Sequence, residues 1–382
     1  MTRTSFSFPT IIEYGPGALN SLPEHVRAHG QSALIVTDPG LTKLPIFEAI
    51  TKTLTDGDIP WSVYSGISPN PLASECEKGG EAFRMSGADV IVGIGGGSGL
   101  DGAKGVALMA THPAPMVSYD DAIGGDQRIS DDVPPVIAIP TTAGTGSEVG
   151  RSTVVVDDVT QRKVVVFSPH LMPVVALIDA QLMTGMPHWL TAATGFDALT
   201  HNLEALTATG FHPMADGIAL EGLSLCARHL LRATTTPDDL TARGGMAMAA
   251  MMGATAFQKG LGVCHSLAHP LSSLAGMHHG LANAVLLPYV VSFNAEHAAD
   301  AYELVRQRVG CSGDLQSWLV DLRRELGIAH TLADAGIDRA LLPELAEQAF
   351  DDACHRSNPR PCTPTDMTRL YVAAFDGVLD VQ

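Results

Sequence analysis

One stretch, Val90-Ile91-Val92-Gly93-Ile94-Gly95-Gly96-Gly97-Ser98-Gly99-Leu100-Asp101-Gly102-Ala103-Lys104, decides the fold class of this 382-residue chain. It begins with a nearly continuous apolar run, which is typical of a strand covered on both faces in a parallel sheet. The glycines that follow indicate a tight turn, and the residues after them open a helix. This order of strand, loop and helix predicts an α/β domain with a parallel sheet.

The two halves of the chain have different sequence patterns. Five further apolar or β-branched runs precede residue 180. Residues 33–37, 136–139 and 174–178 read as strands, and residues 153–157 with 163–167 read as a hairpin. After Met183 the strand pattern stops, and Ala, Leu and Met recur at helical spacing over residues 216–232, 242–257 and 282–298. We therefore predict an α/β domain over residues 1–182 and an all-helical domain over residues 183–382.

Composition excludes several classes of partner. The chain carries 41 acidic and 23 basic residues, a net charge of −18, which argues against binding to nucleic acid. The six cysteines are scattered without a CxxC pair, which favours reduced thiols and a cytoplasmic location. The N-terminus has no apolar signal region, and we expect no membrane partner because no run of about 18 apolar residues occurs.

Two loops after predicted strands favour the binding of a dinucleotide. The glycines at positions 95, 96 and 97 would let backbone N–H groups approach a phosphate at the positive end of the following helix. The second loop, Pro140-Thr141-Thr142-Ala143-Gly144-Thr145-Gly146-Ser147-Glu148, adds hydroxyl and backbone donors. The alternative for each loop is structural: a tight turn for the first, and a turn or helix cap for the second.

Asp38 ends the predicted strand at residues 33–37 and is followed by Pro39-Gly40. An acidic side chain at this position can accept the hydroxyls of an adenosine ribose and would repel a 2′-phosphate. It therefore favours NAD over NADP. The alternative is a simple Asp-Pro-Gly turn with no role in binding.

A group of histidines and one aspartate in the second half suggests a metal site. Asp197 and His201 are four residues apart, so they lie on one face of a helix. Together with His265 and His279 they make a full donor set for Fe(II) or Zn(II). Each of these residues, taken alone, also suits an ordinary cap or surface position.

Taken together, these motifs resemble the iron-containing (group III) alcohol dehydrogenases over essentially the whole chain. The resemblance implies an N-terminal α/β nucleotide-binding domain and a C-terminal helical metal-binding domain. It assigns Asp197, His201, His265 and His279 as ligands, because the family's last ligand directly precedes a glycine, here Gly280. The implied cofactors are NAD and one divalent metal, with Fe(II) ahead of Zn(II).

The resemblance also implies residues around the cofactor. His269, one helical turn after His265, matches a histidine near the nicotinamide that is not a ligand. Asn70 and Lys163 match residues at the cofactor. The complete set expected to bind the cofactor is Asp38, Asn70, Gly95, Gly96, Gly97, Ser98, Asp101, Thr141, Thr142, Thr145, Ser147 and Lys163.

These residues predict hydride transfer between NAD(H) and a small primary alcohol, diol or hydroxy acid. A bound divalent ion lowers the pKa of the substrate hydroxyl, and His269 either relays its proton or only lines the pocket. Lys259, six residues before His265, either binds an anionic group of the substrate or is a surface lysine. The family suggests a homodimer or a larger homo-oligomer.

Three other interpretations stay open. A glycerol or polyol dehydrogenase of related fold would carry fewer histidines in its metal set. An enzyme resembling maleylacetate reductase would need no metal, so four retained ligands count against it. A catalytically silent NAD- or metal-binding protein would bind cofactor without turning over any alcohol or aldehyde.

Overall fold

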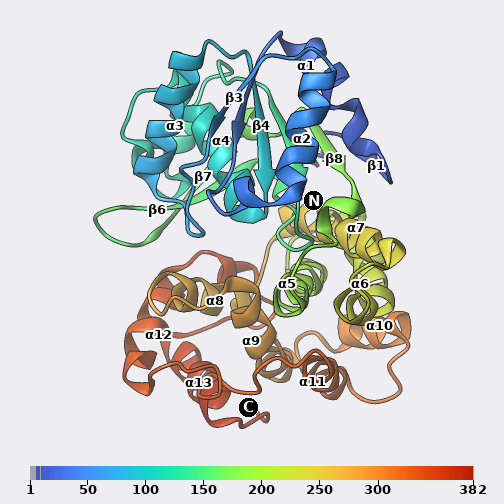
Figure 1. Cartoon of the computed structure of the whole chain (residues 1–382). Coiled ribbons are helices and arrows are strands. Elements are labelled where there is room, and N and C mark those ends of the chain that lie inside the picture. Colours follow the sequence, from blue (N-terminus) through green and yellow to red (C-terminus); the bar gives the residue numbers. More distant parts are fainter. Residues whose placement is uncertain (1–5, 9, 382) are drawn as a thin grey trace. The chain divides into compact units, whose positions relative to one another are not determined.

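The computed structural model describes residues 6–8 and 10–381, which form two compact units (Figure 1). The α/β unit comprises Phe8–Thr142 and Gly146–Met183. The helical unit comprises residues 6–7, Ala143–Thr145 and residues 184–381. The chain therefore leaves the α/β unit for three residues after Thr142 and then returns to it.

A six-stranded, entirely parallel sheet forms the centre of the α/β unit, with the strand order β1-β8-β5-β4-β2-β3. Its strands are Ile11–Tyr14 (β1), Ala33–Val36 (β2), Trp61–Tyr64 (β3), Val90–Gly95 (β4), Val136–Pro140 (β5) and Val175–Ile178 (β8). The four apolar runs predicted as strands are the four inner strands. The predicted hairpin is also confirmed, because Ser152–Val156 (β6) pairs antiparallel with Lys163–Phe167 (β7).

The two edge strands, β1 and β3, did not stand out as apolar runs. Their side chains are exposed or half-buried along the whole strand, and Ile11 and Val63 are 61% and 44% exposed. A parallel edge strand has one neighbour instead of two, so its sequence need not be continuously apolar.

Helices cover both faces of the sheet. On one face, α1 (Leu22–His29) and α2 (Pro45–Asp56) pack against alternate strand residues such as Ile35 and Val92. On the other face, α4 (Gly97–Thr111) packs against residues of the opposite parity, such as Leu34 and Ile91. The period-two alternation of side chains thus explains why every inner strand is apolar throughout. Helix α3 (Ala73–Ser86) packs beside α4.

The strand order reverses between β2 and β4. The chain runs from β2 outward to β3, then crosses back to β4 and continues through β5 in the opposite direction. In open α/β sheets, ligands bind at the carboxyl ends of the strands at such a switch point. Asp38 follows β2 and the glycine loop follows β4, so two predicted cofactor segments flank this point.

The helical unit contains nine of the described α-helices: α5 (His188–Thr207), α6 (Pro213–Thr235), α7 (Leu240–Ala256), α8 (Val263–Ser273), α9 (His279–Asn294), α10 (Ala299–Val309), α11 (Leu315–Glu325), α12 (Leu342–Asp351) and α13 (Pro364–Asp376). All three predicted helical stretches lie here, although α9 ends at Asn294, before residue 298. No described residue of this unit belongs to a β-strand, so the predicted combination of α/β and all-helical parts is confirmed. Among the described helices, none is long and apolar enough to cross a membrane.

Candidate active site

Helix α5 supplies the first part of a polar cluster inside the helical unit. It is buried from Thr191 to Leu206, because other helices surround it. Asp197, His201 and Glu204 follow one another at spacings of four and three residues, so they share one face of the helix. Buried polar side chains of this kind require partners, and those partners come from α8 and α9.

Three histidine rings converge on a single oxygen atom of Asp197. The Nε2 atoms of His279, His265 and His201 lie 3.5, 3.8 and 3.9 Å from Asp197 Oδ1. Asp197, His265 and His279 form the tightest group, with one donor atom each within 4.8 Å of one another. His201 lies beside this group, and its ring stacks on that of His265 with 4.5 Å between centroids.

This donor set fits a divalent metal ion. Nitrogen and oxygen ligands sit about 2.1 Å from a tetrahedral ion, so the ligand atoms should be about 3.4 Å apart. The distances from Asp197 Oδ1 to the three ring nitrogens are close to that value. Three imidazoles and one carboxylate suit Fe(II), Zn(II) and neighbouring ions.

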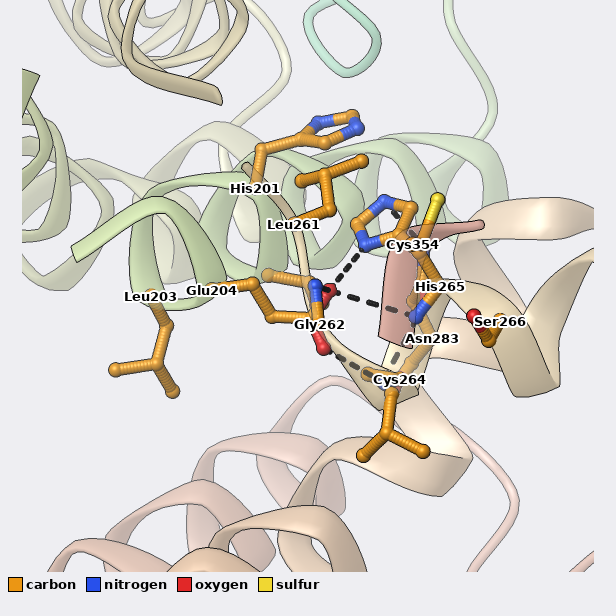
Figure 2. Close-up of polar contacts among 12 residues, drawn as sticks. His201, Leu203, Glu204, Leu261, Gly262, Cys264, His265, Ser266, Asn283 and Cys354 are labelled. Atoms are coloured by element: carbon orange, nitrogen blue, oxygen red, sulfur yellow. Dashed lines mark hydrogen bonds and ion pairs between the residues drawn. The ribbon is translucent and has the colours of Figure 1, made fainter. Parts of the chain in front are cut away.

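Two further residues orient His265 and Asp197. Glu204 lies 2.6 Å from His265 Nδ1 through its Oε2, and it accepts backbone N–H bonds from Gly262 and Cys264 at 3.0 and 2.7 Å (Figure 2). Asn283 on α9 donates its side-chain amide to Asp197 Oδ1 at 2.8 Å. Hydrogen bonds of this kind fix the orientation of a ligand ring or carboxylate and keep its other atom available for a metal.

Burial and charge act in opposite directions on this cluster. Burial raises the pKa of Asp197, but its electrostatic interactions with His201 and His279 and its hydrogen bond with His265 outweigh burial and hold that pKa below its usual range. Burial dominates at His201 and lowers its pKa to about 4. Burial also lowers the pKa of His265, but hydrogen bonds to Asp197 and Glu204 raise it to about 9. The carboxylate is therefore ionised and ready to bind a cation.

His269 lies on α8 one turn after His265. Its ring stacks on that of His279 with 5.3 Å between centroids, and its Nδ1 is 2.7 Å from Asp352 Oδ2. Asp352, which follows α12, also accepts bonds from Ser266 Oγ at 2.7 Å and from the backbone N–H of Cys354 at 2.8 Å. The aspartate is thus held from several sides and fixes the orientation of the His269 ring.

Sequence reasoning missed Glu204 and Asp352. Glu204 had a readable signal, because it lies seven residues after Asp197 on the ligand face of the same helix. Asp352 gave no such signal, since 83 residues separate it from His269 and only the packing of α12 against α8 brings the two together.

In the α/β unit, the glycine loop approaches its surroundings closely. A Cβ atom at Gly99 would lie 2.7 Å from the backbone oxygen of Ile94, and one at Gly96 would lie 3.1 Å from the Thr142 side chain. Gly95 has a φ of 145°, which side chains disfavour. Helix α4 begins at Gly97, so the backbone N–H groups of its first turn, which have no partner within the helix, lie at this loop.

The loops after β4 and β5 lie together, as a shared phosphate site requires. The backbone N–H of Thr141 donates to Gly95 O at 2.9 Å. Ser98 on α4 donates its hydroxyl to the carbonyl of Pro69, which precedes Asn70. Asn70 is exposed and Lys163 begins β7, both within the α/β unit, whereas Thr145 belongs to the helical unit.

Several predicted cofactor residues also have structural partners. Asp101 accepts a bond from the Ser147 hydroxyl and another, at 3.0 Å, from the backbone N–H of Val154. Lys104 is buried, and its ammonium lies 3.2 Å from Asp101. Asp38 Oδ1 accepts the N–H groups of Gly40 and Leu41 at 2.8 and 2.9 Å, so the turn foreseen as an alternative does form. These bonds use only one carboxylate oxygen of Asp38.

Lys259 does not extend toward the metal cluster as an available cation. Its ammonium contacts Asp216 and donates to the carbonyl of Leu206 at 2.8 Å, and its side chain is only 6% exposed. The interpretation of Lys259 as a simple surface lysine is wrong as well, because the residue ties η9 (Phe257–Lys259) to α5 and α6. Arg360 is likewise occupied: it donates to the Phe293 carbonyl at 2.9 Å and covers that ring.

Comparison with known protein families agrees with this geometry. The model of "Iron-containing alcohol dehydrogenase" matches residues 9–180. The model of "Fe-containing alcohol dehydrogenase family, C-terminal" matches residues 191–375. The chain belongs to the iron-containing alcohol dehydrogenases. It is therefore an oxidoreductase that interconverts alcohols and aldehydes, and members of this family typically use NAD(H).

Individual members of the family resemble the chain over almost its whole length. A 4-hydroxybutyrate dehydrogenase of Cupriavidus necator is 37% identical, covering 94% of this chain and 97% of that protein. A lactaldehyde reductase of Escherichia coli K12 is 34% identical over 95% and 97% of the two chains. The crystal structure of a 1,3-propanediol oxidoreductase superposes with a TM-score of 0.93 at 33% identity, covering 98% of this chain and 100% of that one.

Proposed function

We propose that this iron-containing alcohol dehydrogenase binds one divalent metal through Asp197, His201, His265 and His279. The family makes Fe(II) the first choice of metal and the donor set leaves Zn(II) as the second. The observation that carries the proposal is the approach of three ring nitrogens to one oxygen of the buried Asp197. Residues 183–382 would form the metal and substrate domain, and residues 1–182 the nucleotide domain.

The chain's own residues define how an alcohol would react there. When bound, the metal supplies a Lewis acid that lowers the pKa of a substrate hydroxyl and polarises an aldehyde carbonyl. Glu204 and Asn283 keep the ligand side chains in place, so little reorganisation is needed when substrate arrives. Asp197 contributes a negative charge that is already ionised in the folded protein.

His269 is the proposed carrier of the substrate proton. Its Nδ1 faces Asp352 at 2.7 Å, so this nitrogen holds the ring N–H and Nε2 is left as the basic atom. A neutral imidazole in this tautomer can take a proton from an alcohol at Nε2, and the imidazolium so formed can return a proton to an alkoxide. Asp352 acts through His269 and is a positioning residue.

The α/β unit would hold NAD(H). The loops after β4 and β5 present backbone and hydroxyl donors to the pyrophosphate, and the N-terminus of α4 adds its positive end. Asp38 lies at the switch point of the sheet, where its second carboxylate oxygen would accept the ribose hydroxyls. The other residues of the cofactor set lie in or next to these two loops, except Asn70, which precedes α3, and Lys163, which begins β7.

The substrate we propose is a small primary alcohol, a diol or a hydroxy acid, with the matching aldehyde in the reverse direction. The names of the similar proteins support this range, since they act on 4-hydroxybutyrate, lactaldehyde and 1,3-propanediol. Lys259 does not extend the argument to an anionic substrate, because Asp216 already neutralises it.

The decisive experiment compares two adjacent histidines. His279→Ala removes a proposed ligand, whereas His278→Ala changes a neighbour whose ring packs on Trp189. Each protein is stripped with a chelator, reloaded anaerobically with Fe(II) or Zn(II), and assayed for metal content and NADH-dependent reduction of an aldehyde panel. We expect wild type and His278→Ala to bind one metal and turn over aldehyde, and His279→Ala to do neither. Turnover by metal-free wild type would contradict the metal site, and bound cofactors without turnover would indicate a silent binding protein.

We further propose a homodimer that forms through β1. This strand is the edge of the sheet next to β8, and Ile11, Ile12 and Tyr14 are 61%, 37% and 48% exposed on it. An exposed apolar edge strand is a template for pairing with a second copy. Light scattering should show a dimer for wild type and for Ile123→Lys, which changes an exposed residue elsewhere, but a monomer for Ile11→Lys.

We propose a cytoplasmic location. None of the six cysteines forms a disulfide, and Cys311, Cys354 and Cys362 are partly exposed. Accessible thiols outside disulfides persist in a reducing compartment. Fractionation of cells followed by detection of the protein would test this location.

A further inference from the structure

We propose that His269, Asp352 and Cys354 form a second metal site that accepts a thiophilic divalent cation such as Zn²⁺, and that its occupation inhibits the enzyme. The site lies beyond the proposed function, although its inhibitory effect rests on the proposed role of His269. Within the described residues, only this trio and the Asp197 group place three such donor atoms within 4.8 Å of one another.

The donors come from two segments that packing holds together. His269 lies on α8, Asp352 directly follows α12, and Cys354 begins the short η11 helix (Cys354–Ser357). Ser266 Oγ and the backbone N–H of Cys354 both donate to Asp352 Oδ1, at 2.7 and 2.8 Å. The backbone that carries the thiol is therefore tied to the carboxylate, and the trio is present before any metal arrives.

The trio has the composition and access of a zinc site. It offers one nitrogen, one oxygen and one sulfur, and the sulfur distinguishes it from the all-nitrogen-and-oxygen Asp197 set. Thiolate favours Zn²⁺ and similar ions over Mg²⁺, and three protein ligands with a water are a usual zinc arrangement. The side chains of His269 and Asp352 are 21% and 20% exposed, so an ion from solvent can reach them.

Zinc binding at the trio would release the proton of Cys354 and would change the contacts that orient the His269 ring. As the metal–sulfur bond forms, the Cys354 thiol loses its proton to solvent. The metal also competes with the 2.7 Å contact between His269 Nδ1 and Asp352 that fixes the ring tautomer. The two sites share no ligand, yet the His269 ring stacks on that of His279. An ion held by the trio would thus disable the proposed proton carrier without removing the first metal.

The test uses the holoenzyme loaded with its first metal and compares wild type with Cys354→Ser. Cys362→Ser is the matched control, because it removes another partly exposed thiol, one that lies near the carbonyl of Arg360. Added Zn²⁺ is titrated against a chromophoric chelator, and elemental analysis counts zinc and the first metal after desalting. Inhibition is expressed relative to each variant's own rate without zinc.

We expect wild type and Cys362→Ser to bind one additional zinc per chain while retaining the first metal, with activity falling as that zinc binds. Cys354→Ser should bind this zinc at least ~10-fold more weakly, with inhibition shifted to match. Added Co(II) should give a sulfur-to-metal charge-transfer band that Cys354→Ser lacks.

Equal zinc affinity in wild type and Cys354→Ser would overturn the site. Inhibition that accompanies loss of the first metal would also overturn the site. Zinc that binds to the trio without lowering activity would overturn the proposed inhibition. The zinc count does not depend on turnover, so a failure of the proposed function would appear separately as an enzyme inactive before zinc is added.

Discussion

The glycine loop of the α/β unit and the histidine cluster of the helical unit differ in what forms them: backbone in the first and side chains in the second. Four of the five residues from Gly95 to Gly99 are glycines without a side chain, and the backbone of this loop lies close to its neighbours. Around Asp197, side chains from three helices converge, and a further layer of buried acids and amides orients them. The first region is shaped by the absence of side chains at its glycines, and the second by the convergence of side chains from three helices.

The largest difference between the two regions should appear with His265→Ala. Loss of this ring should abolish metal retention and lower kcat/KM for aldehyde reduction by at least ~10³-fold, because the Lewis acid is worth several kcal/mol. NADH binding in the α/β unit, followed by fluorescence, should persist. His265→Ala leaves the buried Glu204 without its histidine partner, which can destabilise the fold. His279→Ala is therefore a second test, because it removes a ligand that is more exposed. Full activity of a metal-free His265→Ala protein would contradict the metal mechanism.

A pH effect should arise in the α/β unit from Glu148. Burial raises the pKa of Glu148 to about 7 from its ordinary 4.5, against opposing effects of a backbone N–H and of Lys104. Because the folded state holds the proton of Glu148 more tightly than the unfolded state does, the contribution of this proton to stability is fully present below pH 4.5. The contribution is lost as pH rises through 7. The free energy of unfolding of wild type, relative to Glu148→Gln, should therefore fall by up to about 3 kcal/mol over this range. Urea denaturation at several pH values measures it, and a constant difference would show that Glu148 does not titrate this way.

Gly99→Ala should damage the nucleotide region alone. The new Cβ would meet the backbone oxygen of Ile94 at 2.7 Å, so the loop must shift, at a cost of about 1–3 kcal/mol. We expect NADH to bind roughly tenfold more weakly while metal content stays at the wild-type level. Gly217→Ala is the control, because a Cβ there meets nothing within 4 Å. Loss of metal from Gly99→Ala would show that the two regions are not independent.

An effect no larger than that of Gly99→Ala should come from Asp38→Asn. An asparagine can still accept the N–H bonds of Gly40 and Leu41 through its side-chain oxygen, but it has no charge to repel a 2′-phosphate. Use of NADPH relative to NADH should rise about tenfold, which corresponds to ~1.4 kcal/mol. Steady-state kinetics with both cofactors measures the ratio. An unchanged ratio of NADPH use to NADH use would show that Asp38 only stabilises the turn and does not select the cofactor.

The sequence predicted what is local and missed what depends on packing. The inner strands were readable because burial on both faces makes them continuously apolar, and the spacing of Asp197 and His201 follows from the helix period. The edge strands β1 and β3 lack that constraint. Glu204 and Asp352 act across 61 and 83 residues, and Lys259 pairs with Asp216 on another helix. Glu204 left one signal, its position on the ligand face of α5, whereas the partnerships of Asp352 and Lys259 leave no periodic pattern in the sequence.

The three residues Ala143–Thr145 have a consequence for engineering. They belong to the helical unit although the chain on both sides of them belongs to the α/β unit, and a Cβ at Gly144 would lie only 2.8 Å from the Cβ of Thr194. The helical part is therefore not a continuous cassette. A chimera that takes residues 184–381 from a relative would keep this short insert from the other parent, so a working exchange must carry residues 143–145 along with it.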